Sequence, residues 1–229
     1  MNHITMKESN IMFDRDNPLI NRFCQRSPSN MRDMIIILGI GSQQQRFDAV
    51  VNTHGNAWRR LGLEAGFLTN ANKQRGAAFT LENQQEIYDK AISCLSLRGR
   101  TVVQLEDRKV HIDNIDLELM KVFLEIPQLG LAKAGFCCQL FAGRIGCIDV
   151  HNLNRLKIDP KVLEFDKSVK SEETRNKRIA AYVDACRKRK CRWLWDSWCN
   201  FLAKRWPNNW RDGDHVSLVH YECLLGGQL

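Results

Sequence analysis

The chain has 229 residues, of which 44% are hydrophobic and 26% are charged, and its lysines and arginines exceed its acidic residues by eight. This composition is typical of a globular protein and excludes wholesale disorder, and no apolar run approaches the roughly 20 residues of a membrane-spanning helix. The first residues lack the apolar stretch of a secretory signal, so we expect an intracellular protein with no membrane partner. The positive balance favours a polyanionic partner.

The N-terminal third is predicted to begin as an irregular arm and to become helical. Residues 1–30 are polar and contain two prolines, so we expect an arm ahead of a single helical domain over 31–229. The apolar-rich segment 35–51 predicts a helix that bends at its two glycines. The Gly- and Asn-rich stretch 61–80 predicts a loop.

The middle of the chain predicts helices joined by short connections. Helical spacing of apolar residues indicates a helix within 81–97, and 101–112 predicts either a short hairpin or an extended loop. Two helices follow over 115–126 and 131–141, separated by a four-residue hairpin that contains proline and glycine. The fold class predicted from these elements is mainly α.

A basic, Trp-rich helical extension is predicted over 165–229, with a long helix over 171–206 that ends before Pro207 and a short closing helix from Asp214. Its basic run contains Arg187, Lys188, Arg189 and Lys190. Such a run forms either a solvated helix face or a contact with a phosphate backbone. Five of the six tryptophans follow this run, and they are either core residues or a platform on which bases stack.

The nine cysteines do not have the spacing of a metal site. No C-x2-C pair occurs, and no paired histidines accompany the C-terminal cysteines, so we predict no metal site. Cys137 and Cys138 fall within a predicted helix and are expected in the core as reduced thiols.

The most informative segment runs from Ile126 to Leu156 and contains the predicted hairpin. A tight turn between two helices leaves backbone N–H groups unpaired at the start of the second helix, where they can bind a phosphate oxygen. Gly130 allows a backbone to approach without a Cβ clash. Downstream, Asp149 lies in an apolar frame, so its carboxylate must be paired, cap a helix that begins near His151, or serve function.

This segment resembles the helix-hairpin-helix DNA glycosylase superfamily, whose hairpin reads Leu-Pro-Gly-x-Gly and whose catalytic aspartate lies in a V-D-T/V-H-like turn. Pro127 and Gly130 match the hairpin, and the run from Asp149 to His151 matches the turn. Upstream, the Ser-Gln-Gln run ending in Gln43 and Gln44 resembles the family's L-S-x-Q or L-Q-Q segment, a residue of which fills the gap left by an extruded base. The resemblance covers about residues 33–158 and implies a glycosylase-like helical fold.

Two departures limit what the resemblance implies. The position of the family's nucleophilic lysine is Ala132 here, and Lys133 is the next residue, about 100° away around a helix. Schiff-base lyase chemistry is therefore not expected. Gln128 also replaces the first hairpin glycine of the family.

The resemblance implies one of two enzyme activities, and a non-catalytic DNA-binding module is the third possibility. The favoured activity follows from IGCIDVHN and GLAKAGF, which resemble a phage branch of the superfamily that makes hypermodified thymines, the amino acid:DNA transferases. These enzymes join an amino acid or amine to phosphate-activated 5-hydroxymethyluracil in DNA. The alternative is a monofunctional glycosylase that excises a modified or damaged base.

The resemblance also implies roles for individual residues. The catalytic candidates are Asp149 and His151, as bases for the incoming amine. The substrate- or base-binding candidates are Gln43, Gln44, Lys133, Arg144 and Asn152. The candidates for contact with the DNA backbone are Pro127, Gln128, Gly130, Arg187, Lys188, Arg189 and Lys190. Double-stranded DNA and a free amino acid or amine are the expected partners, in the host cytoplasm if the chain is phage-encoded. We expect no cofactor, although the backbone carbonyls of the hairpin could hold a monovalent cation.

Overall fold

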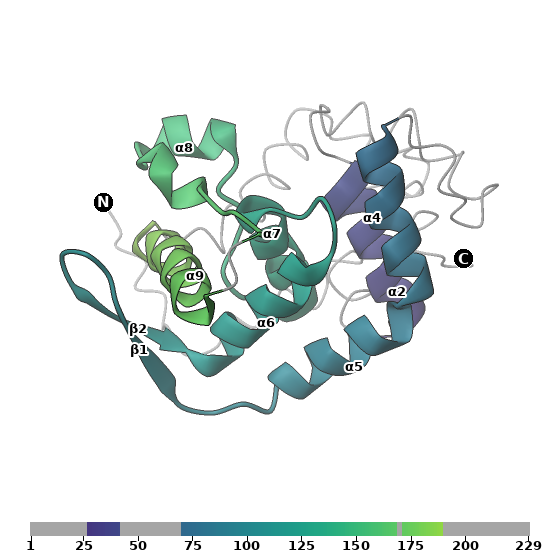
Figure 1. The fold of residues 1–229 in the computed structure, drawn as a ribbon, viewed down its shortest axis with the longest axis horizontal. Helices are drawn as coiled ribbons and strands as arrows, with labels where there is room; N and C mark the ends of the chain where they lie inside the picture. The colour runs from purple at the N-terminus through teal and green to yellow at the C-terminus, as the bar shows by residue number, and fades with distance from the viewer. Residues whose placement is uncertain (1–26, 42–69, 169–170, 190–229) are drawn as a thin grey trace, which may run out of the picture.

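The computed structural model describes residues 27–41, 70–168 and 171–189. In these ranges the protein is mainly helical, as predicted, and a two-stranded antiparallel sheet is attached at one side (Figure 1). No helix in the described ranges is long and apolar enough to cross a membrane.

The first described element is helical from Pro28 onward, within the segment predicted as an arm. Helix α2 (Pro28–Asp33) begins with the proline, which suits a first helical position because its missing N–H has no helical acceptor there. A π-helical segment, η1 (Met34–Gly41), continues it. The arm prediction is therefore wrong for its last residues, while the predicted helix over 35–51 is confirmed as far as the described residues extend.

The predicted loop over 61–80 is wrong where the structure describes it, because α4 (Ala71–Glu82) is a regular helix. Asn70 caps its start, since the side-chain oxygen accepts hydrogen bonds from the backbone N–H groups of Asn72 and Lys73. Gly76 disfavours a helix by intrinsic propensity, but a Cβ there would lie 2.5 Å from the Pro127 carbonyl oxygen. Tertiary packing therefore outweighs local propensity in α4.

Helix α5 (Gln84–Cys94) follows α4 after Asn83 and lies within the predicted helix over 81–97. The next segment is a β-hairpin, one of the two predicted alternatives, in which β1 (Arg100–Gln104) pairs with β2 (Lys109–Asp113). Val103 and Val110 face each other across this pair and are buried.

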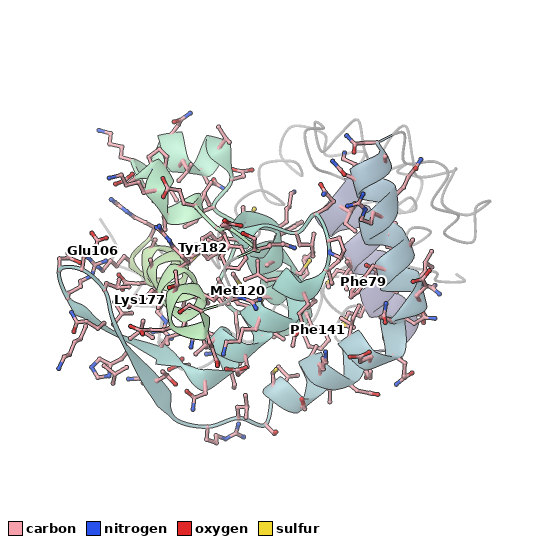
Figure 2. All side chains as sticks on the ribbon, viewed as in Figure 1. Phe79, Glu106, Met120, Phe141, Lys177 and Tyr182 are labelled. Carbon is pink, nitrogen blue, oxygen red and sulfur yellow. The ribbon has the colours of Figure 1, made fainter. Side chains whose placement is uncertain are left out.

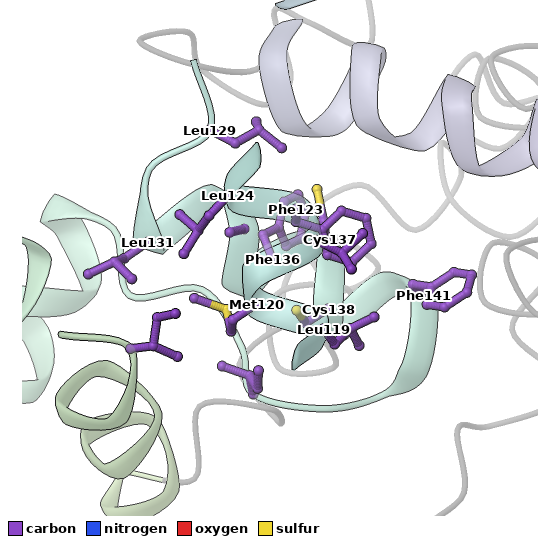
Figure 3. Packing of buried hydrophobic residues seen from close by; sticks show 14 of the residues in the cluster. Leu119, Met120, Phe123, Leu124, Leu129, Leu131, Phe136, Cys137, Cys138 and Phe141 are labelled. Atoms are coloured by element: carbon purple, nitrogen blue, oxygen red, sulfur yellow. The ribbon is translucent and has the colours of Figure 1, made fainter. Parts of the chain in front are cut away.

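The core is built around α6 (Asn114–Glu125) and α7 (Leu131–Ala142), as the apolar spacing predicted. Phe123 and Phe141 meet edge to face in this core, with ring centroids 6.2 Å apart. Figure 3 shows these two rings with Met120, Cys137 and Cys138. Both cysteines are fully buried, which confirms their predicted place in the core.

The described elements of the C-terminal region lie on the side of α6 and α7 that faces away from α4 (Figure 1). They are α8 (Val150–Leu156), the 3-10 turn η3 (Pro160–Leu163) and α9 (Glu172–Lys188). Helix α9 packs against α6, η3 and the sheet (Figure 1). It lies within the predicted helix over 171–206, whose remaining part falls outside the described residues, as do the tryptophans and the predicted closing helix.

Candidate nucleic-acid interface and catalytic carboxylate

The hairpin between α6 and α7 is a tight turn closed by a hydrogen bond from the Leu129 N–H to the Ile126 carbonyl, 3.2 Å. Gln128 has φ +73°, in the left-handed region that glycine favours. Gln128 occupies the position at which the superfamily that this segment resembles has a glycine, and its backbone has the conformation that glycine favours. Leu129 is fully buried and anchors the turn to the core.

Within the described ranges, the start of α7 has no neighbour against Gly130. Gly130 is the N-cap residue and supplies no side-chain cap, and the first helical bond formed from this residue joins its carbonyl to the N–H of Ala134. A Cβ added to Gly130 would meet no atom of a described residue within 4 Å. N–H groups without a side-chain cap and the positive end of the helix dipole together favour an anion at this position.

Two lysines from different helices lie near this helix start. Lys133 belongs to the first turn of α7, and Lys73 belongs to the first turn of α4, which packs closely on Pro127 through Gly76. Burial, and then the charge of Lys133, lower the pKa of Lys73 below its ordinary value. The Lys133 ammonium lies 5.3 Å from the centroid of the Phe136 ring, and the Lys73 ammonium lies 3.4 Å from the Gly41 carbonyl oxygen. An anion between the two ammonium groups would relieve their repulsion.

A third lysine, Lys167, contacts the backbone of the hairpin. The Lys167 ammonium donates to the Ile126 carbonyl at 2.5 Å, although the residue as a whole is exposed. Burial of the ammonium, and then the charge of Arg175, lower the pKa of Lys167 to about 8. The Lys167 ammonium thus occupies the Ile126 carbonyl, one of the hairpin carbonyls at which a monovalent cation was predicted. Binding of that cation stays a prediction. In the described ranges, no group of three or more His, Cys, Asp or Glu side chains is arranged to hold a metal ion.

Asp149 caps helix α8, the non-catalytic role anticipated for it. Its side chain accepts a hydrogen bond from the backbone N–H of Asn152 at 2.8 Å, and Asn152 donates its side-chain amide to the Cys147 carbonyl at 3.0 Å. The Asp149 carboxylate is only partly buried, so capping leaves part of it accessible. Its role as a catalytic base stays a prediction, and the structure describes only the backbone of His151, in α8.

The loop that leads to Asp149 is fixed by a buried tyrosine of α9. The Tyr182 hydroxyl donates to the Gly146 carbonyl at 2.8 Å and accepts from the Ile148 N–H at 2.9 Å. Ile145 and Gly146 both have positive φ, so this loop departs from ordinary backbone geometry. Figure 2 shows Tyr182 pointing from α9 toward the core.

Arg144 and Arg187 are engaged in an ion-pair network with Asp113 and Asp116. The Arg144 guanidinium contacts Asp116 at 2.5 Å and Asp113 at 2.9 Å, while Arg187 lies 3.1 Å from each carboxylate. Asp116 is almost completely buried between the two arginines, and Arg100 also contacts Asp113. The network joins α6, α9, the sheet and the loop after α7, so a contact of either arginine with phosphate would compete with these pairs.

The other basic residues predicted to contact the DNA backbone lie outside this ion-pair network. Lys188 pairs with Asp184 on its own helix at 2.9 Å, and Arg189 is exposed at the end of α9. Gln43, Gln44 and Lys190 lie outside the described residues.

Lys73, Lys167 and Tyr182 contribute to this region but were not singled out from the sequence. Lys73 falls in the segment predicted as a loop, and no motif marks either of the other two residues. The sequence signal that could have placed Lys73 on a helix is Asn70, a residue type that commonly caps a helix start and does so here. Comparisons of the chain with protein-family models, curated proteins and solved structures found no match.

Proposed function

We propose that the chain binds double-stranded DNA through the 126–133 hairpin, with Lys73 and Lys133 on either side of one backbone phosphate. The observation that carries the proposal is the start of α7, which has no side-chain cap, with Lys133 in its first turn and Lys73 in the first turn of α4, the helix that packs on Pro127 through Gly76. A phosphate oxygen would accept from the N–H groups at the start of α7 and separate the two positive charges. Such contacts hold the duplex in register without reading its sequence.

On DNA bound in this way, we propose that an amino acid or amine is joined to phosphate-activated 5-hydroxymethyluracil. The resemblance of segment 126–156 supports this reaction. The base leaves the stack, and the amine nitrogen attacks the C5 methylene carbon, so that a C–N bond forms as the C–O bond to phosphate breaks. The phosphate departs with the bonding electrons, and Asp149 or His151 takes the proton of the amine. Lys133 is better suited than Arg144 to receive the departing phosphate, because Arg144 is held by two carboxylates.

Two alternatives use the same surface. In a monofunctional glycosylase, the Asp149 carboxylate would stabilise positive charge that develops on the deoxyribose. In a non-catalytic module, Asp149 would serve only as the cap of α8, and the hydrogen bond to Asn152 favours this alternative.

Salt dependence tests the binding site. We expect the logarithm of the DNA affinity to fall linearly with the logarithm of salt concentration. The double variant Lys73→Gln/Lys133→Gln should make this slope shallower by about 1, because the two lysines flank one phosphate and each neutralised phosphate contributes roughly 0.9 to it. The control Lys161→Gln/Lys177→Gln removes the same charge from η3 and α9. Equal slopes for the two double variants would exclude the hairpin as the DNA site.

A mass measurement separates the three functions. The protein is incubated with DNA that contains 5-phosphomethyluracil, or with DNA that contains damaged bases, and the products are digested to nucleosides. A heavier thymidine that forms only with an added amino acid or amine supports transfer, and Asp149→Asn should abolish it. Released base or alkali-labile sites would instead establish a glycosylase. A non-catalytic module gives neither product, although it still binds DNA.

A further inference from the structure

The outer edge of strand β1 carries backbone groups that the fold does not use. At the turn, the Leu105 N–H bonds to the Arg108 carbonyl, so these two residues form a hydrogen-bonded pair. Such pairs alternate along an antiparallel ladder, and in this register the N–H and C=O groups of Arg100, Val102 and Gln104 therefore point away from β2. Within 27–41, 70–168 and 171–189, no hydrogen bond reaches these outward groups.

The outer edge of β2 is covered, in contrast to that of β1. Helix α9 packs mainly against β2, on the face of the sheet that holds the buried Val103 and Val110. The Arg187 guanidinium donates to the outward carbonyl of His111 at 2.6 Å. The open side of the sheet is therefore the β1 edge alone.

Strand β1 lacks the features that protect an edge strand in a monomer. Natural edges are blocked by lysine, by proline or by a bulge. The sequence of β1, RTVVQ, contains none of these residues, and it pairs with β2 residue by residue without a bulge. The charge of Arg100 is paired with Asp113 at 2.8 Å, and Val102 at the centre is 52% exposed. An uncharged, β-branched centre with open backbone groups favours the addition of another strand.

The side chains of β1 complement a second copy of the same strand. An antiparallel alignment about a two-fold axis at Val102 places this residue opposite Val102 of the second copy, and Arg100 opposite Gln104. The outward groups then form three hydrogen-bonded pairs with about six hydrogen bonds, whereas a shift by two residues leaves about four. No like charges face each other in this alignment, while a parallel alignment in register would place Arg100 beside Arg100 of the second copy.

We propose that two copies of the chain associate through β1, so that their hairpins form one four-stranded antiparallel sheet in the order β2-β1-β1-β2. On the covered face, Val103 of each copy would lie opposite Thr101 of the other. A strand of five residues spans only about 17 Å, so the contact is small and the dimer should dissociate on dilution. The proposal does not depend on the DNA-binding function, because β1 lies outside the 126–133 hairpin.

Sedimentation velocity of the full chain without DNA tests the proposal over a dilution series. We expect one reversible transition between monomer and dimer. Val102→Pro removes an N–H that points outward, so the β1–β2 ladder stays complete while two of the hydrogen bonds between the copies are lost. The dissociation constant of the dimer should rise by roughly tenfold or more. A wild-type chain that is monomeric at every concentration would overturn the proposal and would favour an extended segment of another protein as the added strand.

Charge substitutions at Val102 locate the two-fold axis. Val102→Lys places two ammonium groups opposite each other, and Val102→Glu places two carboxylates there, so each variant alone should be monomeric. An equimolar mixture of the two should restore the dimer, because the opposed charges then attract. The control His111→Lys adds a positive charge to the same exposed face on β2 and should remain dimeric. Thermal unfolding curves establish that each variant is folded. A dimer that survives Val102→Lys, or a mixture of folded Lys and Glu variants that stays monomeric, would exclude this interface.

Discussion

Tyr182 determines the shape of the loop that leads to Asp149, although it belongs to the more distant helix α9. Its hydroxyl satisfies both the Gly146 carbonyl and the Ile148 N–H. We expect Tyr182→Phe to leave the buried Ile148 N–H unpaired and the Gly146 carbonyl with only the weak bond donated by the Cys186 thiol at 3.7 Å. The free energy of unfolding, measured by urea denaturation, should fall by about 1–3 kcal/mol. The control Ser96→Ala removes an exposed hydroxyl that bonds the Ser93 carbonyl and should change stability by less than about 0.5 kcal/mol. Equal effects of both variants would contradict the role assigned to Tyr182.

Two glycines near the start of α7 have opposite surroundings. A Cβ on Gly135 would lie 2.4 Å from the Gly146 carbonyl oxygen and 2.7 Å from the Tyr182 ring, whereas a Cβ on Gly130 would have no described atom within 4 Å. We expect Gly135→Ala to lower the melting temperature by several degrees, because overpacking costs about 1–3 kcal/mol and exceeds the gain in helix propensity of about 1 kcal/mol. Gly130→Ala should unfold within a degree or two of wild type. A Gly135→Ala protein as stable as wild type would show that α7 and α9 do not approach this closely.

At the scale of elements, α9 is attached to the rest of the fold by the Asp113 and Asp116 network. Burial acts to raise the pKa of Asp113, but the hydrogen bond from Arg100 and the charges of Arg187 and Arg144 outweigh it, so this pKa lies below its ordinary value. A carboxyl whose pKa is depressed on folding contributes stability above its unfolded pKa and loses it as pH falls through the folded pKa. We therefore expect the contribution of Asp113 to be complete at neutral pH and to be lost below about pH 4.

Removal of Arg187 tests this contribution without removal of the carboxylate. We expect Arg187→Gln to shift the acid unfolding transition, followed by circular dichroism between pH 7 and pH 2, to higher pH, because one of the charges that depress the pKa of Asp113 is gone. Lys161→Gln removes an equal charge from an exposed position of η3 and should retain the wild-type transition. Coincident acid transitions for Arg187→Gln and wild type would contradict the prediction.

The elements that the sequence predicted well are those whose packing follows their own periodicity. The helices α6 and α7 present apolar residues at helical spacing, and the Gly143 end of α7 is a left-handed cap that glycine favours. Helix α4 was missed because asparagines and Gly76 disfavour a helix locally, while the contact with the Pro127 carbonyl that stabilises it comes from a distant segment. Single-sequence reasoning does not include such a contact.

The same distinction holds for the candidate site at the scale of the whole molecule. The Asp149 cap depends on its own sequence neighbours, and it was anticipated as one alternative. Lys73 and Lys167 reach the hairpin only because α4 and the segment before α9 pack around it. Arg144, predicted to bind substrate, meets two carboxylates that precede it by about 30 residues, and no local pattern indicates these ion pairs. The hairpin and Lys133 were therefore predictable from the sequence, whereas Lys73 and Lys167 were not.

Buried thiols of three helices belong to one hydrophobic core cluster. Their exposure to a thiol reagent can therefore report whether these helices unfold together. The thiols are those of Cys94 in α5, Cys137 in α7 and Cys186 in α9. Burial raises the pKa of Cys94 to about 11 and that of Cys137 to about 12, so neither thiol forms the reactive thiolate in the folded protein. We expect N-ethylmaleimide pulses in increasing urea, with labelled peptides measured by mass, to reveal these three thiols in one transition. The partly exposed Cys147 should react at lower urea and is the internal control.

The order of labelling distinguishes a single domain from a core with a separable extension. If α9 were docked only by its ion pairs, Cys186 would become reactive before Cys94 and Cys137. Tyr182, Val183 and Cys186 are, however, each almost inaccessible, so the separation of α9 from the core would expose apolar surface on both sides. This cost couples α9 to the helix pair, and we expect Cys186 to have the same urea midpoint as Cys137. A lower midpoint for Cys186 alone would show that the region after 165 unfolds as a unit of its own.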